Sequence, residues 1–216
     1  MPASPPKDVV VLGAGGHAKV VIELLQASGY TIAALLDADP TPRQVLGFGV
    51  QGDDRALDEL REDGVTLAFV AIGDNRRRVA LAQTVRDAGF TLVNAVSPSA
   101  TVSPSAHLGE GVAIMAGAVV NAEVRLGDLC IVNTGATLDH EVTVGMGAHI
   151  APGVAISGNV KVGDLAMMGV GSCAIQGVSI GKGAMVGAGA AVVRDIPDGA
   201  LAVGVPARVK RQQADA

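Results

Sequence analysis

Leu138-Asp139-His140-Glu141-Val142-Thr143 is one unit of a six-residue repeat that fills the second half of this 216-residue chain. Two positions of the unit are restricted in size. A branched apolar residue, with Met168 and Ala174 as exceptions, holds the first position sixteen times without a break: Val96, Val102, Leu108, Ile114, Val120, Leu126, Val132, Leu138, Val144, Ile150, Ile156, Val162, Met168, Ala174, Ile180 and Val186. Nothing larger than valine stands four residues later. A period of six fits neither an α-helix nor a simple strand, so each unit predicts a short strand and a turn.

Glycine indicates how many units make one coil. Gly109, Gly127, Gly145, Gly163 and Gly181 are spaced by 18 residues, which is three hexads. One corner of every coil therefore repeats the same residue, and the coil is predicted to be a triangular prism. With strands stacked about 4.8 Å apart, the column should be roughly 25 Å long. So narrow a bore explains the Val, Ile, Leu and Ala of the inward positions.

The first 94 residues instead alternate apolar runs with helical spacing. Strands are expected over 8–12, 31–36, 67–72 and 91–94, with helices from 18 to 29, 55–62 and 73–88. This order predicts a small parallel sheet, an α/β Rossmann-like half domain. The expected division is residues 1–94 for this domain and 95–216 for the β-helix, with a C-terminal extension whose last part, from Arg208, is a polar tail.

A glycine turn follows the first strand of this half domain. Gly13-Ala14-Gly15-Gly16-His17-Ala18 matches the dinucleotide-binding pattern, and Asp37 closes the next strand about twenty residues on. Such a turn lets a phosphate rest on a helix N-terminus, while the carboxylate takes a ribose hydroxyl. The size of the domain favours a mononucleotide or nucleotide sugar over NAD. The alternative is a glycine turn that serves only tight packing.

A second candidate ligand loop holds Gly73, Asn75 and Arg76, which follow a strand at the sheet edge where ligands bind. The alternative for residues 76–78 is a solvated helix start.

Composition excludes several classes of function. The net charge of −5 gives no basic face for nucleic acid, and no apolar stretch approaches the 18 residues of a membrane span. The N-terminus lacks the features of a signal peptide, so a cytoplasmic protein is expected. Cys130 occupies an inward repeat position and reads as a small core residue, so neither it nor Cys173 is a candidate nucleophile.

His140 is the residue of the repeat best suited to chemistry. It does not occupy an inward position, and its neighbours one coil away, Ala122 and Gly158, are small enough to leave space over the imidazole. With Glu141 beside it to fix the tautomer, it has the composition of a general base. The alternative is an ordinary surface histidine; His149 carries the same ambiguity, and His107 reads as surface.

The hexads resemble those of left-handed β-helix acyltransferases. Over nearly its full length, from the glycine turn through Asn133-Thr134-Gly135-Ala136-Thr137-Leu138-Asp139-His140-Glu141 to Gly204-Val205-Pro206-Ala207, the chain is similar to the sialic-acid O-acetyltransferase-like family. That family includes the bacterial nucleotide-4-amino-sugar N-acetyltransferases. The left hand comes from the resemblance alone, because the usual crossover rule favours the right-handed form.

The resemblance implies an acetyl-CoA-dependent transferase without a metal, working as a homotrimer with sites between adjacent β-helices. It makes His140 the catalytic base and Glu141 its acidic partner. On the CoA side it places Gly158, whose amide lies near the acetyl carbonyl, and His149, Val170, Ala188 and the segment 204–206. On the acceptor side it places Asn133, Gly15, Gly16, His17, Asp37, Gly73, Asn75 and Arg76.

The leading hypothesis is N-acetylation of a UDP-, GDP- or dTDP-linked 4-amino-4,6-dideoxy sugar in glycan or lipopolysaccharide biosynthesis. O-acetylation of sialic acid or a related sugar hydroxyl is the alternative within the class. A metal site of His107, His140 and His149, as in a carbonic-anhydrase-like β-helix, fits poorly because the repeat puts these residues on different faces or coils. A nucleotide-binding scaffold without activity is the non-enzymatic alternative.

Overall fold

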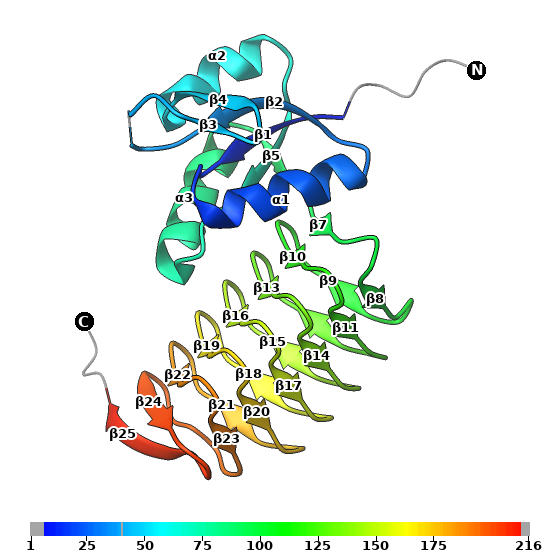
Figure 1. The fold of residues 1–216 in the computed structure, drawn as a ribbon, viewed down its shortest axis with the longest axis vertical. Helices are drawn as coiled ribbons and strands as arrows, with labels where there is room; N and C mark the ends of the chain where they lie inside the picture. The colour runs from blue at the N-terminus through cyan, green and yellow to red at the C-terminus, as the bar shows by residue number, and fades with distance from the viewer. Residues whose placement is uncertain (1–6, 40, 213–216) are drawn as a thin grey trace. The chain divides into compact units, whose positions relative to one another are not determined.

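The computed structural model describes residues 7–39 and 41–212. It divides into two compact units, Met1–Pro98 and Ser99–Ala216, which are drawn in Figure 1. The division predicted from the sequence follows residue 94.

The first unit holds a six-stranded sheet of order β3-β4-β2-β1-β5-β6. Its centre is β1, which pairs in parallel with β2 and β5 and is buried from Val9 to Leu12, because helices cover a parallel sheet on its faces. The strands are β1 (Asp8–Leu12), β2 (Thr31–Leu36), β3 (Gln44–Val45), β4 (Phe48–Gly52), β5 (Leu67–Val70) and β6 (Thr91–Leu92).

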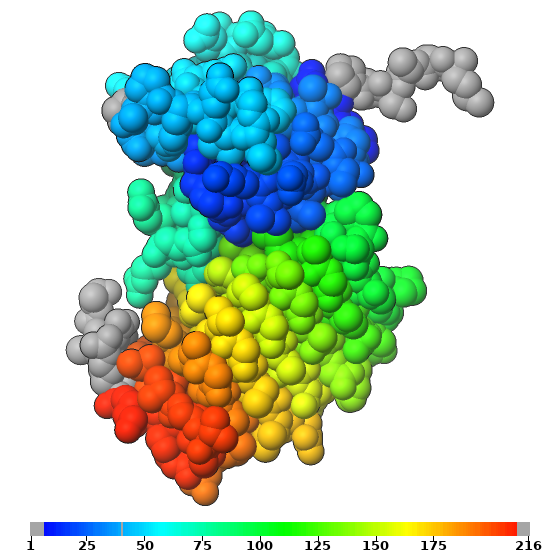
Figure 2. Space-filling view, in the orientation of Figure 1, coloured from blue at the N-terminus to red at the C-terminus, as the bar shows by residue number. Residues whose placement is uncertain are grey.

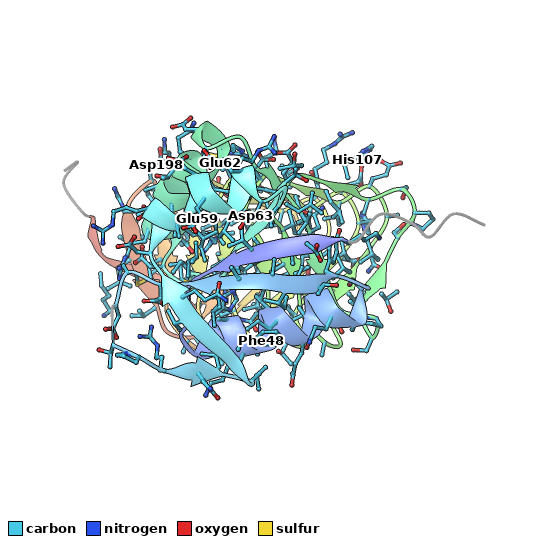
Figure 3. The ribbon with its side chains drawn as sticks, turned by 90° about the horizontal axis from the view of Figure 1, so that it is seen from above. Phe48, Glu59, Glu62, Asp63, His107 and Asp198 are labelled. Atoms are coloured by element: carbon cyan, nitrogen blue, oxygen red, sulfur yellow. The ribbon has the colours of Figure 1, made fainter. Side chains whose placement is uncertain are left out.

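The helices of this unit are α1 (Gly16–Ala27), α2 (Leu57–Glu62) with a preceding 3₁₀ turn η1 (Asp54–Ala56), and α3 (Asn75–Asp87). α2 buries only Leu57, and its acidic residues Glu59 and Glu62, labelled in Figure 3, are exposed. The half domain expected from the sequence is therefore present, with helices and main strands close to their predicted positions.

The β3–β4 hairpin was not predicted. Its two-residue turn is Leu46–Gly47, and both residues have positive φ, 51° and 84°. Two positive φ values define the hairpin turn that suits strand twist, but leucine rarely adopts one. The turn therefore lacks the Asn-Gly or Asp-Gly signal by which hairpins are found in a sequence.

The second unit is a prism of short parallel strands in three sheets, and Figure 2 shows its coils as bands that run from green to red. Partners in neighbouring coils are 18 residues apart, as for Ile131 and His149. One sheet contains β10, β13, β16, β19, β22 and β24, the second β8, β11, β14, β17, β20 and β23, and the third β9, β12, β15, β18 and β21. This is the predicted three-sided coil.

The strands of the coils have two residues each, apart from the last two. They are β7 (Ala95–Val96), β8 (Thr101–Val102), β9 (His107–Leu108), β10 (Ala113–Ile114), β11 (Val119–Val120), β12 (Arg125–Leu126), β13 (Ile131–Val132), β14 (Thr137–Leu138), β15 (Thr143–Val144), β16 (His149–Ile150), β17 (Ala155–Ile156), β18 (Lys161–Val162), β19 (Met167–Met168), β20 (Cys173–Ala174), β21 (Ser179–Ile180), β22 (Met185–Val186), β23 (Ala191–Val192), β24 (Ala200–Val203) and β25 (Arg208–Gln212). β25 pairs antiparallel with β24, so part of the expected polar tail is a strand.

Two kinds of corner explain the glycines of the repeat. At Gly145 the backbone has no positive φ, but a Cβ would lie 2.5 Å from the amide nitrogen of Asp164 in the next coil, so only glycine allows the approach. At Gly153 space is open and φ is +67°, which glycine adopts without strain. Other corner positions have a positive φ but carry side chains, among them Glu141 and Leu165.

Candidate active site

His140 and Glu141 lie on the corner between β14 and β15, and both side chains are exposed. The His140 Nδ1 lies 3.0 Å from the Glu141 Oε2. An ionised carboxylate only accepts hydrogen bonds, so Nδ1 carries the proton of the neutral ring and the Nε2 lone pair is left for a substrate proton. Glu141 achieves this contact at a φ of 60°, a conformation that costs an L-residue of the order of 1 kcal/mol.

Gly158 lies one coil on, against the Cε1 and ring nitrogens of the His140 imidazole. A Cβ built on Gly158 would be 2.5 Å from the imidazole Nε2 and 3.0 Å from Nδ1, and closest of all to Cε1. φ at Gly158 is not in the left-handed region, so the reason for glycine is space. The imidazole therefore occupies the volume that any side chain at position 158 would need.

Asn133 and His149 form a second polar pair on the adjoining face. The Asn133 Oδ1 accepts the Thr134 N–H at 2.8 Å, which directs its Nδ2 to the His149 Nε2 at 3.0 Å. Nε2 of His149 therefore acts as an acceptor. Asn133 directly follows β13 and His149 begins β16, whereas His140 follows β14. One full side of the triangular coil separates this pair from His140, so a single chain does not bring the two groups together.

Val170 and Ala188 stack in successive coils, since the Gly189 N–H donates to the Val170 carbonyl at 2.9 Å. Both are exposed, and 56% of the Val170 surface is open to solvent. They form an apolar edge well removed in sequence from the His140 corner.

A pocket of about 730 Å³ in the first unit collects most of the other predicted residues. Its lining includes Gly15, Gly16, His17, Asp37 and Gly73. No protein atom lies within 4 Å of where a Cβ on Gly15 or Gly16 would be, so the start of α1 faces open space. The α1 N-terminus has no side-chain cap and no acidic residue in its first turn, which leaves its N–H groups free to bind an anion.

Two predicted residues of the second loop lie elsewhere. Asn75 and Arg76 are not part of the pocket lining, and Asn75 Oδ1 accepts a hydrogen bond from the Arg78 guanidinium at 2.9 Å. Arg77 lines the pocket instead. Arg78 is 1% exposed and also donates to the carbonyls of Ile72 and Gly73, so it supports the loop from within. The first turn of α3 is thus not simply solvated.

Two titratable groups of the pocket, His17 and Asp37, have lowered pKa values. Burial, with a smaller contribution from the charge of Arg78, lowers the pKa of His17 to about 4, and its buried Nε2 has no hydrogen-bond partner among the described residues. Burial raises the pKa of Asp37, but hydrogen bonds from the N–H groups of Asp39 and Ala14 and from Arg43 outweigh it and hold that pKa below its usual value.

The chain is similar to known proteins over both units. The family described as PglD N-terminal domain matches residues 8–85. The structure of PerB from Caulobacter crescentus, in complex with CoA and GDP-perosamine, is 56% identical, with a TM-score of 0.92 over 94% of this chain and 97% of PerB. The chain belongs to the nucleotide-4-amino-sugar N-acetyltransferases of the left-handed β-helix class.

Two further members of this N-acetyltransferase family are more distant. The acetyltransferase domain of PglB from Neisseria gonorrhoeae, in complex with acetyl coenzyme A, is 40% identical, with a TM-score of 0.88 over 94% of this chain and 99% of that one. UDP-N-acetylbacillosamine N-acetyltransferase from Bacillus subtilis is 39% identical over 112 residues, or 51% of this chain. The matched part of the chain covers 52% of the length of this curated relative.

Family membership confirms the resemblance and the fold class predicted from the sequence. The described residues of this N-acetyltransferase contain no group of three or more His, Cys, Asp or Glu arranged to hold a metal ion. His107 is exposed on β9 (Figure 3) and pairs in register with Arg125. Within residues 7–39 and 41–212 no helix has the length and apolar character needed to cross a bilayer.

Proposed function

We propose that this chain transfers the acetyl group of acetyl-CoA to the 4-amino group of a nucleotide-linked 4-amino-4,6-dideoxy sugar. The observation that carries the proposal is His140, exposed beside Glu141 with its Nε2 lone pair free. A GDP-linked acceptor is the first candidate, because the relative that was solved with GDP-perosamine is 56% identical. UDP- and dTDP-linked acceptors follow. The reaction is placed in the cytoplasm, as a step that supplies acetylated sugar for glycan or lipopolysaccharide assembly.

The chemistry requires an amine that has lost its proton. His140 Nε2 accepts a proton from the sugar ammonium while Glu141 holds Nδ1–H and stabilises the imidazolium. The amine lone pair then forms a bond to the thioester carbonyl carbon. An amide such as that of Gly158 stabilises the oxyanion, and the C–S bond breaks. The nitrogen loses its second proton to solvent, and the thiolate takes the first one from His140. The products are the acetamido sugar, CoA and one released proton, with no acylated enzyme.

The pocket of the first unit suits the nucleotide. The uncapped start of α1 at Gly15 and Gly16 can receive the diphosphate, and the Asp37 carboxylate stands where a ribose hydroxyl is bound in related sheets. His17 lines the pocket and is neutral at pH 7, so it places no charge beside the nucleotide. Gly73 closes the other side of this pocket.

The proposal includes a homotrimer whose sites are shared between chains. His140 and the Asn133–His149 pair are one side of the coil apart within a chain, and a neighbour could bring its own pair to His140. Mixing His140→Ala and His149→Ala chains by joint refolding tests this. Neither variant alone has a complete site, but in an equal mixture that assembles at random about a quarter of all sites combine an intact His140 with an intact His149 from the neighbour. Activity near a quarter of the unmodified enzyme supports shared sites; no recovery means that each site belongs to one chain.

The decisive experiment measures thiol release from acetyl-CoA with a panel of GDP-, UDP- and dTDP-linked 4-amino sugars. Turnover of one amino sugar should fall roughly 100-fold or more in His140→Ala. If no amino sugar is turned over but a free or CMP-linked sialic acid is, the reaction is O-acetylation and the proposal is wrong. Equal rates in the unmodified enzyme and His140→Ala would remove His140 from the mechanism.

A further inference from the structure

Asp139 immediately precedes His140 on the same exposed corner, and the mechanism above gives it no part. Its Oδ1 accepts two hydrogen bonds, from the backbone N–H of His140 at 2.8 Å and from the Asn121 side chain at 3.3 Å. Because a carboxylate only accepts, the Asn121 amide must turn its nitrogen toward Asp139. Asn121 lies one coil before Asp139, so the carboxylate is fixed by its own turn and by the neighbouring coil.

The other oxygen of this carboxylate, Oδ2, accepts no hydrogen bond from the part of the chain that the structure describes. In residues 7–39 and 41–212, no cationic side chain pairs with Asp139. The side chain is exposed. The result is a carboxylate held in place through one oxygen, with its charge uncompensated and its second oxygen open to solvent beside the proposed base.

Asp139 and His140 are consecutive residues of one exposed corner, so the carboxylate and the imidazole face solvent within two residues of each other. The neighbours of His140 in the adjoining coils are Ala122, which has only a methyl group, and Gly158, which has none. A ligand atom that approaches His140 Nε2 therefore meets few side chains from above or below. The residue before His140 is Asp139, whose carboxylate Asn121 holds from the preceding coil.

We propose that Asp139 binds the ammonium group of the acceptor and so makes the site select an amine over a hydroxyl. This inference rests on the proposed function. The ammonium has three N–H groups: one donates to Asp139 Oδ2 and one gives its proton to His140 Nε2. The lone pair that results attacks the thioester. A sugar hydroxyl brings no positive charge, so it gains little from the same carboxylate.

Asp139→Asn tests the proposal with the least change in shape. The variant keeps an oxygen to accept the His140 N–H but turns a donor, without charge, toward the ligand. The KM for the amino sugar should rise about tenfold with a smaller change in kcat, the size expected for one charge-assisted hydrogen bond at an exposed site. The inhibition constant of the matching sugar with a 4-hydroxyl, measured as a competitive inhibitor, should stay within about twofold.

Asp164→Asn is the matched control. Asp164 also accepts a backbone N–H, that of Met146 at 2.8 Å, but on a different corner of the coil. It should leave both constants unchanged. If Asp139→Asn alters amino sugar and hydroxyl analogue alike, Asp139 only shapes the turn; if it alters neither, Asp139 has no part in binding. Both results overturn the inference while the unmodified enzyme still turns over the amino sugar, whereas absence of that turnover refutes the proposed function itself.

Discussion

Gly158→Ala should separate the geometry of the His140 ring from the stability of the coil. The added Cβ would lie 2.5 Å from the imidazole Nε2, whereas ordinary contact begins at 3.4 Å. The ring must therefore move by about 0.9 Å. Its Nδ1 is 3.0 Å from the Glu141 Oε2, and a shift of this size takes the pair beyond hydrogen-bonding distance.

The expected cost lies in catalysis. A displacement near 1 Å of a catalytic group lowers kcat by roughly 100-fold. Stability should change little, by about 1 kcal/mol or less, because the His140 side chain is 59% exposed and can turn toward solvent without leaving a cavity. The assays are steady-state turnover of the amino sugar and urea unfolding of the same preparations.

The double variant His140→Ala/Gly158→Ala provides the control. The methyl group that Gly158→Ala adds clashes with the imidazole of His140, which the double variant lacks. Gly158→Ala should therefore cause no further loss of activity in the His140→Ala background. If Gly158→Ala keeps kcat within about threefold of the unmodified enzyme, the position of the ring is not critical and the reasoning is wrong. If it lowers activity equally with and without His140, Gly158 acts through something other than the ring.

Three further predictions concern stability. The pKa of His17 is about 4 in the folded chain and 6.5 in the unfolded chain, so only the unfolded chain binds a proton at this residue as the pH falls to 5. The unfolding free energy, measured by urea titration, should therefore drop by about 2 kcal/mol between pH 7.5 and 5. His17→Gln should remove this part of the pH dependence. Ser172 is fully buried, and its Oγ has no hydrogen-bond partner among the described residues. Ser172→Ala should therefore raise the unfolding free energy by about 1 kcal/mol, and Ala190→Ser, one coil on, should lower it; a loss of stability in Ser172→Ala would show that the hydroxyl is hydrogen-bonded. Glu141→Gly should raise the unfolding free energy by about 1 kcal/mol, because glycine adopts the positive φ without strain, while kcat falls about tenfold or more. Unchanged stability would contradict the strain at Glu141, and unchanged kcat would contradict its role in orienting His140.

The repeat shows why the solenoid could be predicted well. Each hexad specifies one strand and one turn by local pattern, and each coil rests on the residues 18 positions before and after, so tertiary neighbours can be read directly from sequence spacing. The stacking of Gly158 beneath His140 follows from that rule. What spacing left open is the reason for the glycine: whether position 158 needs a free backbone or an empty volume depends on where the imidazole points.

The first unit depends on contacts that no spacing encodes. The sequence alone determined its strand-turn-helix order and the glycine turn with Asp37, because burial and backbone freedom leave local signatures. Only the tertiary structure decided that Arg78 is buried and supports the 72–73 loop, that Arg77 rather than Arg76 lines the pocket, and that Leu46–Gly47 closes a hairpin. These outcomes depend on which face of α3 meets the sheet and on a strained turn that packing stabilises. Likewise, only the structure decided that Asn133 and His149 form a hydrogen-bonded pair and that one side of the prism separates this pair from His140 within the chain.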